Sequence, residues 1–152
     1  MRCDQTARES ALTMLERSDR TEKEIRQKLH EKGYEAEAID EAVAFLKEYR
    51  YVNDAEYAAK YTRVYSTRKS IRQIRCELER RGVAREVIDE ALTENDVDEE
   101  AQIRTLLLKK GYQPGERMEA AAYRKLTGAL TRKGFSYEAI RRVTDRMDEE
   151  EY

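Results

Sequence analysis

The sequence predicts an all-α protein built from three tandem three-helix repeats, and three observations support this. One phrase occurs three times, as LHEKGYEAEAIDEAV at 29–43, LERRGVAREVIDEAL at 78–92 and LTRKGFSYEAIRRVT at 130–144. The chain has one proline and six glycines and is rich in helix-forming residues. Charged residues make up 41% of its 152 residues, which favours thin helical layers with wide wet faces over one thick core.

The three copies share one frame, and their glycines lie 49 and then 52 residues apart. The frame contains, in order, an aliphatic residue, a leucine, a basic residue, a glycine, a large apolar residue and an isoleucine. In the first copy these are Ile25, Leu29, Lys32, Gly33, Tyr34 and Ile39. In the second they are Ile74, Leu78, Arg81, Gly82, Val83 and Ile88. In the third they are Leu126, Leu130, Lys133, Gly134, Phe135 and Ile140. A period of this size is typical of stacked supersecondary units, and each glycine is expected to end a helix in the left-handed conformation.

The first repeat, assigned to residues 1–50, is predicted to contain three helices. The apolar stripe of its first helix is Ala7, Ala11, Leu12, Met14 and Leu15. The segment RSDR then interrupts the pattern, and Thr21 with Glu24 forms a capping box for the second helix. A third helix is expected from about Ala36 through Leu46.

The second repeat, assigned to residues 51–95, restarts with a capping box of Asn53 and Glu56. After the break STRKS, Ser70 with Gln73 is expected to cap the next helix. The apolar stripe of the first helix contains Tyr57, Tyr61, Val64 and Tyr65. This helical spacing is more typical of a core face than of a surface on which unpaired bases stack, although the second interpretation stays open for the tyrosines.

The third repeat, assigned to residues 96–152, opens near Asp98 and contains the loop GYQPG. A long helix is predicted from about Glu116 to Lys133, and Ser136 starts the last helix. No β pattern is present, so helices account for all the predicted regular structure.

Repeats of this size bury little apolar surface alone, and stacking lets neighbours share it. We therefore expect an elongated, curved array with a concave face. A compact globule of this length would have a radius of gyration of about 15 Å. Small-angle scattering should give a clearly larger value, and a radius near the globular one would contradict the array.

Chemistry-bearing residues are few. Two cysteines and one histidine are too few for a zinc site, which needs about four ligands. No phosphate loop or glycine-rich nucleotide turn occurs, so we expect neither a cofactor nor enzymatic activity. Cys3 and Cys76 are expected to be free thiols in a reducing compartment. Because the sequence shows no secretory signal and no apolar run of membrane-spanning length, a cytoplasmic location is expected.

Charge is strongly segregated along the chain. Residues 60–85 contain nine lysines or arginines and two acids, whereas residues 86–100 contain eight acids and no lysine or arginine. The tail DRMDEEEY is also acidic. A basic block beside an acidic block indicates oriented contact with a charged partner.

The basic block supplies the candidate binding residues, which are Arg63, Arg68, Lys69, Arg72, Arg75 and Arg81. Arg72 and Arg75 are expected on the outer face of one helix, with Arg68 and Lys69 in the loop before it. Such clustering fits contacts with phosphates. The alternative is a solvated face with weak surface ion pairs.

Four segments in order, ALTMLERSDRTEKEIRQKLHEKGY, YVNDAEYAAKY, IRQIRCELERRGV and LTRKGFSYEAI, resemble the RecX regulatory proteins over residues 7–147. The resemblance implies a fold of three tandem three-helix repeats. It also implies that the chain binds RecA recombinase filaments on single-stranded DNA and modulates them, usually as an inhibitor. The implied partners are the filament and single-stranded DNA, met directly or within the filament, without a membrane, and we expect a monomer. The family often has glycine where this chain has Ser70.

Two alternatives remain at this stage. Helix-turn-helix regulators are also small trihelical units with a basic recognition helix. A helical-repeat scaffold without nucleic-acid contact would also fit the repeats, and it would show no salt-sensitive binding to DNA.

Overall fold

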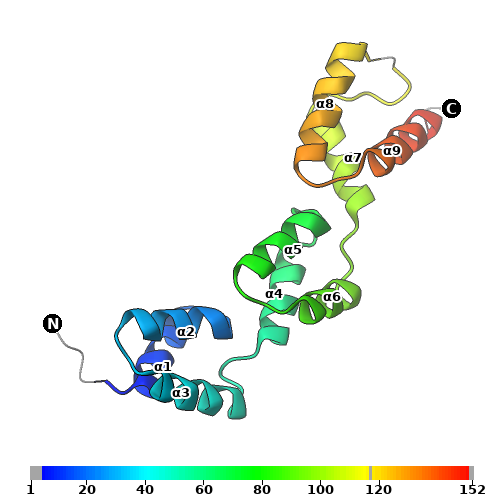
Figure 1. Cartoon of the computed structure of the whole chain (residues 1–152). Coiled ribbons are helices and arrows are strands. Elements are labelled where there is room, and N and C mark those ends of the chain that lie inside the picture. The colour runs from blue at the N-terminus through cyan, green and yellow to red at the C-terminus, as the bar shows by residue number, and fades with distance from the viewer. Residues whose placement is uncertain (1–4, 117, 151–152) are drawn as a thin grey trace. The chain divides into compact units, whose positions relative to one another are not determined.

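The computed structural model describes residues 5–116 and 118–150, and within them it contains nine α-helices and no strand (Figure 1). The helices are α1 (Ala7–Arg17), α2 (Glu22–Glu31), α3 (Ala36–Glu48), α4 (Asp54–Tyr65), α5 (Ile71–Arg80), α6 (Arg85–Glu94), α7 (Glu99–Lys109), α8 (Ala120–Arg132) and α9 (Tyr137–Glu150). This confirms the predicted all-α class and the three helices of each repeat. None of these helices is both long and apolar enough to cross a membrane.

The chain divides into two compact units, and the boundary passes through the middle repeat. The first unit contains α1, α2, α3, the part of α4 up to Tyr61, and the segment Glu77–Glu94. The second unit contains Thr62–Cys76 and the residues from Asn95 onward. Helices α4 and α5 therefore contribute to both units.

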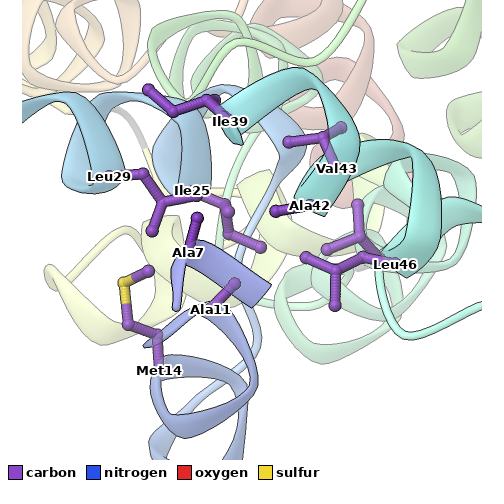
Figure 2. Packing of buried hydrophobic residues seen from close by; sticks show 10 residues of the cluster. Ala7, Ala11, Met14, Ile25, Leu29, Ile39, Ala42, Val43 and Leu46 are labelled. Carbon is purple, nitrogen blue, oxygen red and sulfur yellow. The ribbon is translucent and has the colours of Figure 1, made fainter. Parts of the chain in front are cut away.

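The core of the first repeat lies where α1 and α2 pack against α3 (Figure 2). Figure 2 shows Ile25 and Leu29 of α2 directed toward the α1 alanines and the inner face of α3. The side chains of Ile25, Leu29 and Leu46 are fully buried. The small residues Ala7 and Ala11 let the helices approach closely, so a short repeat still forms a dry core.

The core of the third repeat is built by α7, α8 and α9 in the second unit. Its fully buried side chains are Ile103, Leu107, Leu130, Ile140 and Met147. Tyr112 extends this core, because its ring is buried while its hydroxyl donates to Asp148 Oδ1 at 2.7 Å. Burial and this carboxylate raise the pKa of Tyr112.

The start of α8 corrects a prediction, because the helix begins at Ala120 and not near Glu116. The N–H of Glu116 donates to the carbonyl of Gln113, which closes a turn. Gly115 adopts a positive φ of 78°, and its N–H donates to Asp148 at 3.0 Å. These tertiary contacts commit the segment to a turn that a helical pattern cannot reveal.

Helix α4 presents a different face to the core than predicted. Ala58 and Thr62 are buried, whereas Val64 is 48% exposed and the three tyrosines of the stripe are half-buried. Since successive helical residues are rotated by about 100°, Val64 lies far around the helix from Thr62. The prediction of a core position was therefore wrong for Val64.

The predicted helix ends are confirmed. Gly33, Gly82 and Gly134 have φ values of 90°, 89° and 104°, and in each case the following N–H donates to the leucine carbonyl of the frame. Thr21 and Ser70 also cap their helices through the predicted capping boxes.

The two capping hydroxyls make a second contact that recurs between repeats. Thr21 Oγ1 donates to the carbonyl of Arg81 at 2.6 Å, and Ser70 Oγ donates to the carbonyl of Lys133 at 2.6 Å. In both cases the first residue caps the second helix of one repeat, and the acceptor follows the second helix of the next repeat. We call these two contacts between successive repeats, Thr21 with Arg81 and Ser70 with Lys133, the junctions. Each junction lies within one unit.

A carboxylate completes both junctions. Asp54 accepts from the N–H of Glu22 at 3.0 Å, and Glu99 accepts from the N–H of Ile71. Asp54 and Glu99 are the first residues of α4 and α7, so they occupy equivalent places in successive repeats. Burial raises the pKa of both carboxyl groups, while the positive end of the helix dipole favours their charge.

Close packing at the second junction leads to a testable difference between glycines. A Cβ on Gly134 would lie 2.7 Å from Ser70 Oγ and 2.9 Å from Arg72 Cβ, whereas a Cβ on Gly33 would meet nothing within 4 Å. Gly33→Ala should therefore cost only the left-handed conformation, about 1 kcal/mol. Gly134→Ala should cost about 2–3 kcal/mol, because overpacking is added. Urea unfolding checks this, and equal losses would show that the junction yields freely.

Candidate functional site

Four of the predicted binding residues form what we call the basic edge, defined as Arg63, Arg68, Lys69 and Arg72. All four lie in the second unit, within Thr62–Cys76. Arg63 is exposed in the last turn of α4, Arg68 is exposed in the connecting turn, and Arg72 is exposed in the first turn of α5. Lys69 is half-buried and already has an interaction partner.

Arg75 and Arg81 differ from the basic edge. Arg75 lies on α5 in the second unit, but it is half-buried and already has a partner. Arg81 lies in the first unit. The expected outer face of Arg72 and Arg75 thus presents one exposed cation, Arg72.

The turn that carries Arg68 and Lys69 is organised around Tyr65. The Tyr65 carbonyl accepts the N–H groups of Arg68 at 3.0 Å and Lys69 at 2.9 Å. The Arg68 guanidinium carbon lies 5.2 Å from the centre of the Tyr65 ring, and Lys69 Nζ lies 4.1 Å from it. Both cations are therefore held against an aromatic ring by cation–π attraction.

Gln102 connects this turn to α7 by hydrogen bonds. The sequence analysis did not identify this residue. Its side chain is buried, and Nε2 donates to the carbonyls of Ser66 and Lys69, both at 2.8 Å. A buried amide is costly unless it is hydrogen-bonded, so these bonds specify the path of the turn. The available signal was an amide beside Ile103 in an apolar stripe.

Arg72 is exposed, but the stem of its side chain packs against a neighbouring backbone. Its Cβ and Cδ pack over the backbone of Gly134, where an added Cβ would meet them at 2.9 and 3.3 Å. The positive end of the α5 dipole adds to the field of the basic edge, although Glu99 already occupies the N–H of Ile71. Arg68, Lys69 and Arg72 are therefore preorganised cations suited to phosphates or carboxylates.

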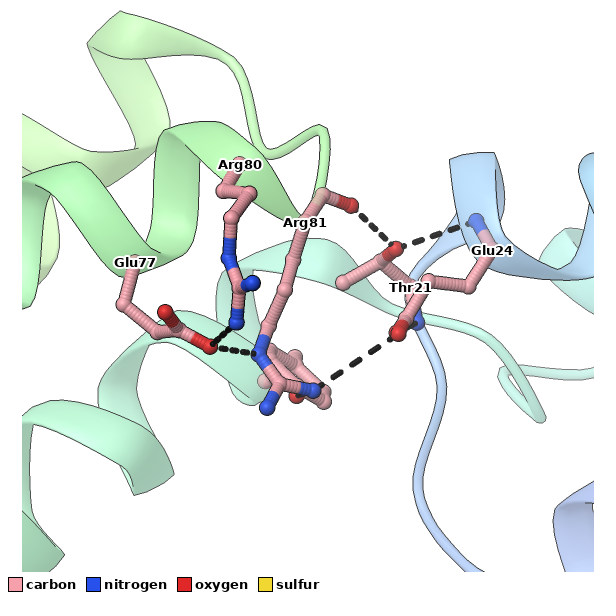
Figure 3. A network of polar contacts seen from close by, with 6 residues as sticks. Thr21, Glu24, Glu77, Arg80 and Arg81 are labelled. Atoms are coloured by element: carbon pink, nitrogen blue, oxygen red, sulfur yellow. Dashed lines mark hydrogen bonds and ion pairs between the residues drawn. The ribbon is translucent and has the colours of Figure 1, made fainter.

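Arg81 belongs to a polar network in the first unit (Figure 3). Its Nε donates to Glu77 Oε1 at 2.9 Å, and its Nη1 donates to the Tyr57 hydroxyl at 2.8 Å. The same Nη1 lies 3.6 Å from Glu24 Oε2. These bonds link the second repeat to the capping box of the first, so the observed contacts of Arg81 hold the repeats together.

Glu77 gives this network a pH dependence. A hydrogen bond from Arg80, together with one from Arg81, lowers the pKa of Glu77 below its usual value of 4.5. The stabilisation is therefore complete above pH 4.5 and is lost as the pH falls through the lowered pKa. Glu77→Gln should cost about 1 kcal/mol at pH 7, after discounting for solvent screening, and a smaller amount at about pH 3, where the charged form is already being lost.

The matched control is Glu79→Gln, because Glu79 is exposed on the same helix. Urea unfolding at both pH values measures the difference. A Glu77→Gln loss that stays constant with pH would show that charge on this carboxylate is not the cause.

Metal binding has no support in the described residues, since no group of three or more His, Cys, Asp or Glu there could hold an ion. Cys76 is an exposed free thiol, and Cys3 lies outside the described residues.

Comparison with known proteins assigns the chain to a family. Three family models, describing the first, second and third three-helix domains of RecX, match residues 7–46, 53–92 and 98–144 in that order. The chain belongs to the RecX family. Its relatives include the regulatory protein RecX of Clostridium botulinum (strain Alaska E43 / Type E3), which is 36% identical over 139 residues. That match covers 90% of this chain and 66% of the relative, so the chain spans slightly less than two thirds of that RecX protein.

Other RecX proteins extend the comparison. The regulatory protein RecX of Clostridium perfringens (strain 13 / Type A) is 34% identical over 146 residues, covering 94% of this chain and 69% of the relative. A crystal structure of regulatory protein RecX superimposes with a TM-score of 0.78 at 29% identity, covering 91% of this chain and 71% of that one. The crystal structure of RecX from Lactobacillus salivarius gives a TM-score of 0.77 at 23% identity, covering 93% and 94%, and shows the shared fold.

Proposed function

We propose that this RecX-family chain binds RecA recombinase filaments on single-stranded DNA and lowers their assembly and activity. The observation that supports this most strongly is the ordered match to all three RecX domains. In this proposal the chain acts as a cytoplasmic monomer in DNA repair and recombination and in the SOS response.

The basic edge is the proposed contact with phosphate or with acidic RecA surface. Arg68, Lys69 and Arg72 sit on a turn and a helix start held by Gln102 and Ser70. A preorganised edge loses little conformational entropy on binding. Each phosphate that it neutralises releases counterions and makes binding salt-sensitive.

Regulation in this proposal requires binding alone. A chain that occupies the filament or favours loss of RecA subunits changes filament activity without making or breaking a bond. We therefore assign no catalytic residue.

Co-sedimentation with RecA assembled on single-stranded DNA tests the proposal. The chain should pellet with the filaments, and less of it should pellet as salt is raised. Salt-sensitive binding to free duplex DNA, without binding to filaments, would instead support a helix-turn-helix-like regulator. No pelleting at any salt concentration would overturn filament binding.

A further inference from the structure

A pocket of about 270 Å³ opens in the first unit beside the end of α1, the segment after α3, and α4. Arg20, Arg50 and Lys60 bring positive charge to it, and Asp19 and Glu56 bring negative charge. Lys60 Nζ lies 2.7 Å from Asp19 Oδ2, and Arg50 Nη2 lies 3.2 Å from Glu56 Oε1. Lys60 is thus paired with Asp19, Arg50 keeps donors beyond the one that Glu56 accepts, and Arg20 makes no ion pair among the residues that the structure describes.

The Arg20 guanidinium has an unsatisfied donor. Its Nε is buried and has no hydrogen-bond partner among the residues that the structure describes. Buried polar groups are nearly always paired, so an exception needs a reason. A guanidinium presents its donors in a planar fork that matches two oxygens of a phosphate or a carboxylate. Because protein atoms cover this Nε, a ligand would meet the outer nitrogens of Arg20, which lines the pocket. An anionic group in the pocket would pair with the Arg20 charge there.

Exposed aromatic rings accompany Arg20. Tyr51 lines the pocket and is 56% exposed, and Tyr49 is 60% exposed. The Phe45 ring centre lies 4.8 Å from that of Tyr49 and 6.2 Å from that of Tyr51. Arg8 covers Phe45 at 4.0 Å from its ring centre, whereas Tyr49 and Tyr51 are exposed to solvent. Exposed aromatic rings beside cations are the usual platform for bases of single-stranded nucleic acid.

Arg50 occupies a backbone position that favours glycine. Its φ of 59° makes it the one non-glycine residue with positive φ in the described part of the chain. Arg50 is the second residue after the end of α3, and the second residue after the end of α2, α5 and α8 is a glycine with positive φ. Side chains rarely adopt this conformation, and such strain is often kept at functional sites. Here it places a guanidinium side chain that is 72% exposed beside the pocket.

We propose that this pocket binds one nucleotide of single-stranded DNA, with the phosphate on Arg20 and Arg50 and the base stacked on Tyr51. The volume is just below the range of about 300–1,000 Å³ for small-ligand pockets, which suits one phosphate and part of its nucleotide. A carboxylate from an acidic protein segment would satisfy Arg20 but would leave the tyrosine faces uncovered. This contact deepens the proposed function and rests on it for the choice of DNA.

Tryptophan fluorescence tests the pocket directly, because the chain contains no tryptophan. The Tyr51→Trp variant places a single reporter in the pocket, and an oligomer of about 15 thymidines should quench it by base stacking. Adding Arg20→Gln should raise the half-saturating oligomer concentration about tenfold, as expected when a charged hydrogen-bond donor is lost. An abasic oligomer of the same length should not quench the reporter.

Two further variants serve as controls. Glu37→Trp places a reporter at an exposed position of α3 in the first unit, outside the residues that line the pocket, and it should not be quenched. Arg50→Gly, added to Tyr51→Trp, should relieve the strained turn and preserve the fold, yet weaken quenching of the pocket reporter. Weaker binding by a variant that is at least as stable cannot result from unfolding.

Three results would overturn the pocket. They are a Tyr51→Trp reporter that the oligomer does not quench, quenching that Arg20→Gln leaves unchanged, and a reporter that responds to an oligoglutamate peptide but not to the oligomer. Failure here leaves the co-sedimentation with RecA filaments unaffected. Quenching of the pocket reporter in a chain that does not bind filaments would instead support the pocket and contradict the proposed function.

Discussion

Replacing Thr21 by alanine is expected to lower the free energy of unfolding by about 2–3 kcal/mol. The Thr21 hydroxyl accepts the N–H of Glu24 at 3.2 Å and donates to the carbonyl of Arg81 at 2.6 Å. Loss of the helix cap costs about 1 kcal/mol. Leaving the Arg81 carbonyl without its donor costs about 1–2 kcal/mol more. Urea unfolding followed by circular dichroism measures the sum.

Thr6→Ala isolates the cap from the junction. Thr6 caps α1 with the same capping box, accepting from Glu9 at 3.1 Å, but its hydroxyl makes no bond to another repeat in the described residues. It should therefore cost only about 1 kcal/mol. Ser70→Ala should match Thr21→Ala, because Ser70 makes the same pair of bonds. Equal losses for Thr6→Ala and Thr21→Ala would show that the junction bond contributes nothing.

Reversing Arg68 and Arg72 together to glutamate is expected to weaken binding to filaments or single-stranded DNA by about 100-fold, since two phosphate contacts become repulsive. With about four phosphates neutralised, the log–log salt slope of the unmodified chain should be near −2.8, and the loss of two contacts should bring it to about −1.4. Both side chains are exposed, so the fold should persist. Fluorescence anisotropy with a labelled oligonucleotide across a salt series measures both quantities.

A charge-matched variant separates location from net charge. Lys125 and Arg141 are exposed on α8 and α9, and reversing both changes the net charge of the chain by the same amount. This control should bind almost normally. If the two double variants weaken binding equally, the effect is one of overall charge. If neither does, the basic edge is a solvated face and binding occurs elsewhere.

Local patterns were enough to predict most of the helices. The left-handed glycines and the hydroxyl caps are determined by residues within one helical turn, so Gly33 and Thr21 could be placed from their neighbours alone. The start of α8 could not be predicted, because Asp148 fixes the preceding turn from a distant part of the chain.

The contacts at the junctions could not be predicted from the sequence for the same reason. Thr21 and Arg81 are 60 residues apart, and Ser70 and Lys133 are 63 apart. A capping serine or threonine looks the same in sequence whether or not its hydroxyl also donates to another repeat. Only the repeated spacing of cap and glycine could have suggested that the two meet.

The candidate site was predicted in composition better than in geometry. Charge segregation identified a segment in which Arg68 and Arg72 are exposed as expected. Burial and pairing depend on tertiary contacts, so sequence alone could not separate Arg81, held by Glu77 and Tyr57, from the cations of the basic edge. The pocket around Arg20 was missed because its lining comes from separate segments.

The rate of ATP hydrolysis by RecA filaments on single-stranded DNA tests the central claim most directly. The account predicts that this rate falls progressively after the chain is added below the RecA concentration, and that the chain alone hydrolyses no ATP. The Arg68 and Arg72 double reversal should largely abolish the effect, while the Lys125 and Arg141 control keeps it. An unchanged rate at a chain concentration equal to that of RecA, or ATP hydrolysis by the chain alone, would contradict the account.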